Sequence, residues 1–304
     1  ASGFASSQRP AWLWPRPRIL QPGCGAALRF FSNPQEMDCS MIRYLLAMLV
    51  LTAYPAAASP PQEPAVASQH FHWRPAAADD TPRPWAILLP GASGLEIFGD
   101  DQHYFRVASW LNARGFDVLV VDYQRASRLL PDTQEGRPGP RIARVVRHAV
   151  STERARGRMD RGCGGIVMGW SLGGEGMGEI ASQGSAGLPG LVGAIGYYPS
   201  VRGQTRGYVP AVPVLVLQGL DDRITPARRL HRFVNRTVRN ELVDVRLFEG
   251  AVHGFDVESL IMPQMNGRLA FAPAAAGSAE AALSAQLDRL DLACRSEPSL
   301  EHNN

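Results

Sequence analysis

The chain has 304 residues, of which 45 % are hydrophobic and 19 % are charged. This composition is that of a globular domain and excludes wholesale disorder. The formal net charge is +3, but residues 1–58 carry five arginines against Glu36 and Asp38, so the remainder is near neutral. The sequence has no lysine and no basic stripe interleaved with aromatic residues, so we expect no nucleic-acid partner.

Residues 1–58 have the features of a leader. Met41-Ile42-Arg43 precedes an apolar run over Tyr44–Ala53 and then Ala56-Ala57-Ala58, which is the order of a secretory signal peptide. This run is too short to cross about 30 Å of hydrocarbon, so we expect no stable membrane insertion after processing. Residues 1–40 fit an upstream, non-native start. We expect a secreted or periplasmic protein, with an organellar transit segment or a membrane anchor as the alternatives.

Two cysteines, Cys163 and Cys294, remain after the leader. They can pair in an oxidising compartment or stay as separate thiols, and their spacing leaves both open. No Cys-x-x-Cys pair exists, which disfavours a cysteine-based metal site. The expected organisation is a linker and edge strand over residues 59–83, one folded domain over residues 84–293 and a tail over residues 294–304.

The domain alternates apolar runs with segments of helical spacing. Such runs predict buried parallel strands, and the segments between them predict helices on both faces of the sheet. The predicted strands are His70–Trp73, Trp85–Leu89, Phe116–Val121, Gly165–Met168, Leu191–Tyr197, Val212–Gln218 and Leu242–Phe248. The predicted helices are Gln102–Arg114, Ile142–Ala155, Leu172–Ser182, Ala227–Val238 and Ala276–Ala293, with Thr225 as an N-cap. The fold class is therefore α/β, with a mostly parallel, doubly wound sheet.

Ser171 lies in Gly169-Trp170-Ser171-Leu172-Gly173-Gly174, between a predicted strand and a predicted helix. A tight strand-to-helix turn exposes a serine hydroxyl for attack, and it needs glycines where a Cβ would clash. A hydroxyl is a weak nucleophile unless a base takes its proton and a third group holds that base. Ser171 is therefore the candidate nucleophile.

His253 is the candidate general base, because it lies in a glycine-flanked loop directly after the last predicted strand. His231 falls within a predicted surface helix and His302 within the tail. Asp222 is the candidate acid, preferred over Asp221, since both follow the strand Val212–Gln218 at the edge where this fold class places its catalytic groups.

The oxyanion formed during acyl transfer requires two N–H donors. Leu172 N–H, at the start of the helix after the nucleophile, is one candidate. Ala92 N–H, in the loop Pro90–Gly94 after the strand Trp85–Leu89, is the other. The segments Tyr123–Pro140 and Met262–Pro273 are expected to be long loops that line or cover the pocket.

Together these segments resemble the dienelactone hydrolase family of the α/β-hydrolase fold over about residues 84–293. Gly169–Gly174 is similar to the family's nucleophile elbow, Gly219–Pro226 to its acid loop and Glu249–Asp256 to its histidine loop. Glu96-Ile97-Phe98-Gly99 is also similar to the segment after the third strand, where the family has a glutamate that contacts the resting nucleophile.

The departures from the family narrow the expected chemistry. The family's name-giving enzymes use cysteine where this chain has Ser171, and they hold the substrate carboxylate with an arginine that Asp256-Val257-Glu258 does not offer. We therefore expect a serine hydrolase of small-molecule esters or lactones rather than of dienelactone. No cofactor or metal is implied, and the oligomeric state stays open. The alternatives are a peptidase or acyltransferase on the same fold, or a non-catalytic binding protein.

Overall fold

The computed structural model describes residues 67–159, 162–203 and 207–295. The predicted leader over residues 1–58, the start of the predicted linker and His302 lie outside the described residues. Within the described ranges, no helix has both the length and the hydropathy that crossing a bilayer requires.

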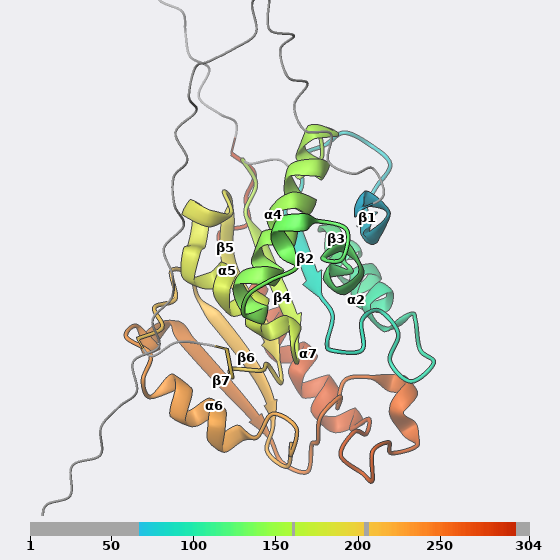
Figure 1. Cartoon of the computed structure of the whole chain (residues 1–304), viewed down its shortest axis with the longest axis vertical. Coiled ribbons are helices and arrows are strands. Elements are labelled where there is room, and N and C mark those ends of the chain that lie inside the picture. Colours follow the sequence, from blue (N-terminus) through green and yellow to red (C-terminus); the bar gives the residue numbers. More distant parts are fainter. Residues whose placement is uncertain (1–66, 160–161, 204–206, 296–304) are drawn as a thin grey trace, which may run out of the picture. The chain divides into compact units, whose positions relative to one another are not determined.

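Seven strands form one sheet in the order β1-β3-β2-β4-β5-β6-β7 (Figure 1). Their bounds are Phe71–Arg74 (β1), Trp85–Leu89 (β2), Asp117–Val121 (β3), Gly165–Trp170 (β4), Leu191–Tyr197 (β5), Val214–Gly219 (β6) and Val243–Phe248 (β7). Strand β1 pairs antiparallel with β3, and every other pair is parallel. The predicted fold class and the edge position of the first strand are therefore confirmed, and the structure adds that this strand is antiparallel.

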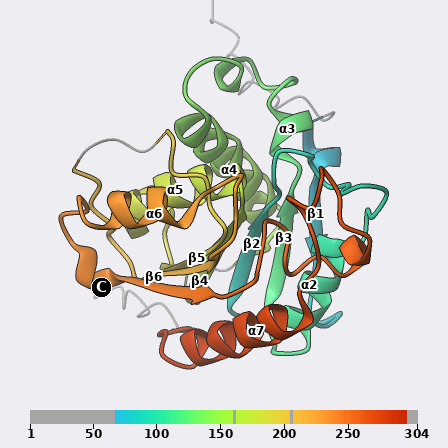
Figure 2. The ribbon, with the colours of Figure 1, turned by 90° about the horizontal axis from the view of Figure 1, so that it is seen from below.

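Helices cover both faces of this sheet (Figure 2). Helices α2 (His103–Asn112) and α7 (Pro273–Leu287) pack on one face. Helices α3 (Tyr123–Ala126), α4 (Pro138–Ala155), α5 (Gly173–Gly187) and α6 (Ala227–Val234) pack on the other. Both faces of β2 are buried, with Ile87 and Leu89 on the side of α4 and α5 and Leu88 on the side of α2. This two-sided burial explains why the strand is a continuous apolar run.

Three predictions about local structure were wrong. Thr225 does not cap a helix, because α6 begins at Ala227 with Pro226 in the N-cap position, and the helix ends at Val234. The closing helix begins three residues earlier than predicted and ends at Leu287, so Leu290 packs on the core from outside it. The expected loop Tyr123–Pro140 contains α3, the 3-10 turn Pro131–Thr133 and the start of α4. Prolines are compatible with that first turn, where their missing N–H has no helical partner to lose.

A disulfide joins Cys163 and Cys294, which are 131 positions apart. Next to it, Arg295 N–H donates to Gly162 O at 2.8 Å, so the chain beyond α7 is tied to the start of β4. Of the two possibilities that the sequence left open, the structure has the paired form. The covalent loop encloses Ser171 and every chain segment from there to the end of α7.

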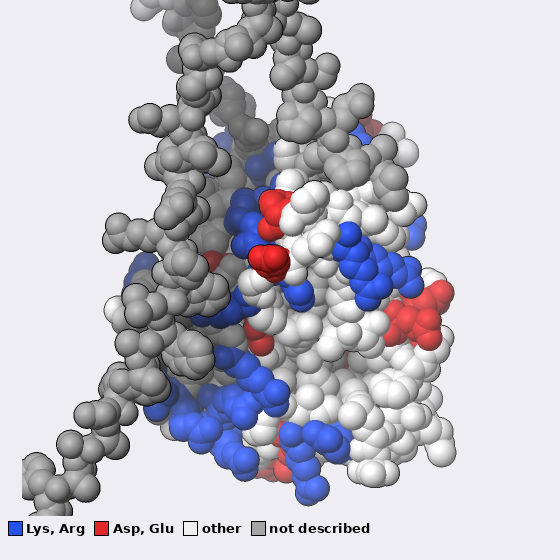
Figure 3. Space-filling model, in the orientation of Figure 1, with Lys and Arg blue, Asp and Glu red and all other residues white. Residues whose placement is uncertain are grey.

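Positive charge gathers over α6 on the face that Figure 3 shows. The helix carries Arg228, Arg229 and Arg232, none of which forms an ion pair with another described residue. The net charge of the domain is therefore near zero even though the surface of α6 is basic. Its large apolar side chain, Phe233, packs against the core, so the region lacks the exposed aromatic residues of a single-strand binding surface.

Candidate active site

Ser171 lies at a sharp turn between β4 and α5. Its φ is +47°, a left-handed conformation that is rare for a residue with a side chain. The neighbouring glycines have no room for a Cβ, which would lie 2.6 Å from Gly173 O if built on Gly169 and 2.1 Å from Leu89 O if built on Gly173. The steric role predicted for the glycines is confirmed. The turn presents the hydroxyl at the carboxyl edge of the sheet.

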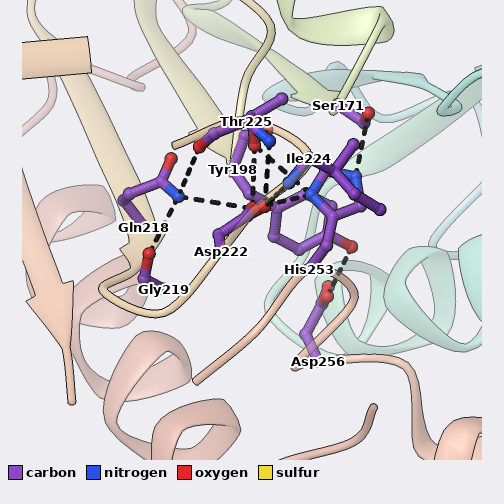
Figure 4. Close-up of polar contacts among 9 residues, drawn as sticks. All are labelled: Ser171, Tyr198, Gln218, Gly219, Asp222, Ile224, Thr225, His253 and Asp256. Carbon is purple, nitrogen blue, oxygen red and sulfur yellow. Dashed lines mark hydrogen bonds and ion pairs between the residues drawn. The ribbon is translucent and has the colours of Figure 1, made fainter. Parts of the chain in front are cut away.

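The three residues proposed from the sequence meet at this edge (Figure 4). His253 Nε2 lies 3.0 Å from Ser171 Oγ, and His253 Nδ1 lies 2.7 Å from Asp222 Oδ2. His253 is 6 % exposed and Asp222 is 3 % exposed. An imidazole whose Nδ1–H is donated to a carboxylate presents Nε2 as an acceptor for a hydroxyl proton. The arrangement can therefore move a proton from Ser171 to His253.

Four hydrogen bonds besides the one with His253 hold the Asp222 carboxylate. Ile224 N–H and Thr225 N–H donate to Oδ1 at 2.7 and 2.9 Å, while Thr225 Oγ1 and Gln218 Nε2 lie 2.8 and 3.3 Å from Oδ2. Burial alone would raise the pKa of Asp222, but the contacts with His253 and Thr225 outweigh it, so the pKa lies below the ordinary value of 3.8. The carboxylate is therefore ionised when it faces the imidazole.

The other sequence candidates lie elsewhere. Asp221 is exposed, and its N–H donates to Ala251 O at 3.1 Å. His231 is exposed on α6, as expected of a surface helix. Glu96 is exposed, and no hydrogen bond or ion pair joins it to Ser171 within the described residues, so it does not take the place of the family's glutamate.

Three side chains fix the loop Pro90–Gly94 against the nucleophile. Tyr104 Oη accepts from Gly91 N–H at 2.9 Å, and Tyr123 Oη donates to Pro90 O at 3.0 Å. Gln124 Nε2 donates to Gly91 O at 3.0 Å. A Cβ on Gly91 would lie 3.5 Å from Ser171 Cβ, so this backbone passes directly beside the serine.

Neither Ala92 N–H nor Leu172 N–H donates to an acceptor within the described part of the chain. Leu172 immediately precedes α5, whose amino end carries a partial positive charge. These two N–H groups have no hydrogen-bond acceptor within the described chain, and both belong to segments that adjoin Ser171. They could therefore donate to an oxyanion that develops on a substrate. Ala92 and Leu172 therefore remain the candidate donors.

A partly buried carboxylate that sequence reasoning missed, Asp256, lies near the imidazole. Asp256 accepts from Trp170 Nε1 and from Tyr198 Oη, both at 2.7 Å, and its Oδ2 lies 3.5 Å from His103 Nε2. Tyr198 in turn packs its ring against His253, with 4.4 Å between the ring centroids. Burial would raise the pKa of Asp256, but its contacts with His103, Tyr198 and Trp170 hold it below 3.8.

The signals for this network in the sequence are faint. Asp256 stands three positions after His253 in the same loop, and Tyr198 directly follows β5. Tyr198 has φ +36°, a second strained backbone beside the site. A tyrosine after a strand and an aspartate in a loop are common, so only the fold shows that they are in contact.

A mostly parallel sheet covered on both faces, with a strained serine at a strand end and a histidine and an aspartate from later loops, defines the α/β-hydrolase fold. The model of the dienelactone hydrolase family matches residues 74–291. The chain therefore belongs to the dienelactone hydrolase family, which supports a hydrolase of ester bonds acting on small molecules. No curated protein matches the chain.

Solved structures share the fold at low sequence identity. A dienelactone hydrolase-like promiscuous phosphotriesterase from metagenomic libraries has a TM-score of 0.56 and 22 % identity, over 72 % of this chain and 91 % of that one. A putative dienelactone hydrolase from Klebsiella pneumoniae subsp. pneumoniae has a TM-score of 0.53 and 16 % identity, over 72 % and 92 %. A puromycin-hydrolysing peptidase from Mycobacterium tuberculosis has a TM-score of 0.51 and 18 % identity, over 74 % and 38 %. These likenesses concern the fold, which different reactions share.

Proposed function

We propose that the protein is a serine hydrolase that cleaves carboxylic esters or lactones through an acyl-enzyme intermediate. The observation that carries the proposal is the continuous chain of contacts from Ser171 Oγ through His253 to Asp222, at 3.0 and 2.7 Å. Such a chain makes a hydroxyl nucleophilic near neutral pH, because the proton has an acceptor and the resulting imidazolium has a counter-charge.

In the proposed reaction, Ser171 Oγ attacks the ester carbonyl carbon while its proton passes to His253 Nε2. The carbonyl electron pair moves onto oxygen, where Ala92 N–H and Leu172 N–H would stabilise it. The tetrahedral intermediate collapses, the leaving alcohol takes the proton from His253, and the acyl group stays on Ser171. Water then attacks the acyl-enzyme with His253 as base, which releases the acid and restores the serine.

A pair of serine variants tests this proposal. Ser171→Ala should lower kcat/KM for p-nitrophenyl butyrate by about 10⁴-fold or more, because the nucleophile is removed. Ser182→Ala is the matched control, since that hydroxyl donates to Glu179 O within α5, away from the site. Full turnover by Ser171→Ala would refute the assignment.

The leaving group separates the esterase from a peptidase. The kcat/KM for p-nitrophenyl esters should be higher than that for the corresponding p-nitroanilides. An amine must be protonated as it leaves, whereas p-nitrophenol can leave as its anion. Faster turnover of the anilides would indicate a peptidase that uses the same three residues, and the esterase proposal would be wrong.

A further inference from the structure

A cleft of about 310 Å³ lies between α2 and α7. Figure 2 shows these helices next to one another on one face of the sheet, and Trp110 on α2 donates to Glu280 on α7 at 2.7 Å. Neither Ser171 nor His253 is among the residues that line the cleft. Asp256 lines the cleft and accepts hydrogen bonds from Trp170, which precedes Ser171 in the chain, and from Tyr198, whose ring packs against His253. We call this space the α2–α7 cleft.

The charges that face the α2–α7 cleft are mainly negative. Asp256, Glu258 and Glu280 line it, and Arg106 is its one guanidinium among the described lining residues. Arg106 is already paired, because both of its terminal nitrogens bond to the Asp100 carboxylate. Glu258 also lies 3.9 Å from Arg106 Nε, and Asp256 lies 3.5 Å from His103 Nε2. Three carboxylates against one guanidinium that already pairs with Asp100 leave a net negative charge on the lining, which favours a cation over a neutral or anionic ligand.

Aromatic and aliphatic side chains form the walls. Trp110, Tyr197 and Phe271 line the cleft together with Val107 and Leu283. The Arg114 guanidinium already lies over the Trp110 ring, 3.4 Å from its centroid, so Tyr197 and Phe271 are the rings that could attract a bound cation. The aliphatic groups accommodate an apolar body. The Trp110 indole also holds the Glu280 carboxylate in place beside it through the hydrogen bond between them.

His103 supplies an independent sign of an incomplete site. Its side chain lines the cleft, is 3 % exposed as a residue, and has no hydrogen-bond partner for Nε2 within the described chain. This nitrogen lies 3.5 Å from Asp256 Oδ2, within ion-pair distance. A buried ring nitrogen with a long ion-pair contact and no hydrogen bond is under-satisfied, and such atoms are typical of places where a ligand or an ion completes the structure.

We propose that the α2–α7 cleft is a second binding site, separate from the catalytic residues, for a small organic cation with an apolar body. At roughly 30 Å³ for each water-sized group, the cleft holds about ten non-hydrogen atoms. A protonated arylalkylamine has this size, an ammonium for the carboxylates and a ring for the walls. The site stands whether or not the protein is an esterase.

The test measures binding of 2-phenylethylammonium by calorimetry in about 0.15 M salt, with 2-phenylethanol as a neutral ligand of the same shape. The protein is the full chain carrying Ser171→Ala, so turnover plays no part. We expect saturable binding of the amine with a Kd of about 1 mM or below and at least fivefold weaker binding of the alcohol. Equal affinities, or no saturable binding of the amine, would overturn the proposal.

Two α7 variants locate the binding. A Cβ built on Gly277 meets no atom within 4 Å, so a leucine can be accommodated at this position. Its side chain would occupy the cleft, and Gly277→Leu should therefore weaken amine binding at least tenfold. Ala281→Leu is the matched control, because Ala281 is exposed on the same helix and does not line the cleft. Glu280→Gln should weaken the amine several-fold and leave the alcohol unchanged. Binding that survives Gly277→Leu would place the amine elsewhere and overturn the proposal.

Discussion

The ring of Tyr198 lies 4.4 Å from the ring of His253, tilted by 55°. Tyr198 cannot swing away easily, because its hydroxyl donates to Asp256 and its N–H donates to Leu217 O. The imidazole is therefore bounded by an aromatic face, by Asp222 at Nδ1 and by Ser171 at Nε2. Such confinement limits the rotation that would break the proton path.

Tyr198→Ala should lower kcat by about tenfold or more, since the imidazole gains freedom to rotate, whereas Tyr198→Phe should keep most of the activity because the ring remains. Tyr198→Phe should instead lower the free energy of unfolding by about 1–3 kcal/mol, because Asp256 loses a donor. Ester turnover and urea unfolding of both variants measure these effects. An unchanged kcat in Tyr198→Ala would show that the ring does not position His253.

Asp222→Asn should lower kcat by about 10⁴-fold, the size of the effect in other enzymes with this arrangement. The amide cannot balance the imidazolium charge, and its NH₂ group favours the wrong histidine tautomer. Asp221→Asn is the matched control, because that side chain is exposed one position earlier. Comparable losses in the two variants would indicate damage to the loop rather than the loss of a charge beside His253.

Tyr104→Phe should lower kcat by about tenfold with little change in KM. The substitution removes the acceptor of Gly91 N–H and loosens the loop that carries Ala92, so the loss falls on the transition state. Tyr208→Phe is the control, because Tyr208 Oη donates to Gly178 O in a buried setting away from this loop. Both variants should lose stability, and only Tyr104→Phe should lose kcat.

Stability should fall in acid partly because of Asp256. Its pKa in the folded protein lies below 3.8, so the unfolded chain binds more protons as the pH falls through this range. The stabilisation is complete above about pH 5 and is lost as the pH drops toward the folded pKa. Asp256→Asn should therefore show a flatter decline in the free energy of unfolding between about pH 5 and pH 2.5. A decline as steep as that of the wild type would show that Asp256 does not contribute.

The disulfide should stabilise the fold chiefly by restricting the unfolded chain. A covalent loop spanning 131 positions is expected to contribute about 2–5 kcal/mol. The double variant Cys163→Ala/Cys294→Ala should therefore melt about 5–15 °C lower. Wild-type protein under strong reductant should approach the variant's Tm. An unchanged Tm in both would mean that the bond does not form in solution.

The positions of the strands along the chain and the three residues that meet at the candidate site could be predicted because each carries a local signal. Buried strands are apolar runs, Ser171 is marked by glycines with no room for a Cβ, and His253 and Asp222 follow strands. Thr225 shows where local signals fail. A threonine before a proline has the pattern of a helix cap, but here its hydroxyl lies 2.8 Å from Asp222 Oδ2, a contact formed only when the loop folds.

The residues that support the site were beyond prediction for the same reason. Asp256 meets Trp170 and Tyr198 across 86 and 58 positions, and no spacing rule links them. Tyr104 likewise reaches Gly91 from a helix whose apolar pattern indicates only that the side chain is buried. Sequence patterns identify groups whose chemistry is unusual, whereas tertiary packing decides which ordinary residues hold them.

The most direct test of the central claim is the site of covalent labelling by a fluorophosphonate ester, located by mass spectrometry of the digested protein. We predict stoichiometric phosphonylation of Ser171 in the wild type, much slower labelling in His253→Ala and none in Ser171→Ala. Labelling of a different serine together with loss of ester turnover, or equal rates with and without His253, would contradict the proposal that these residues act together.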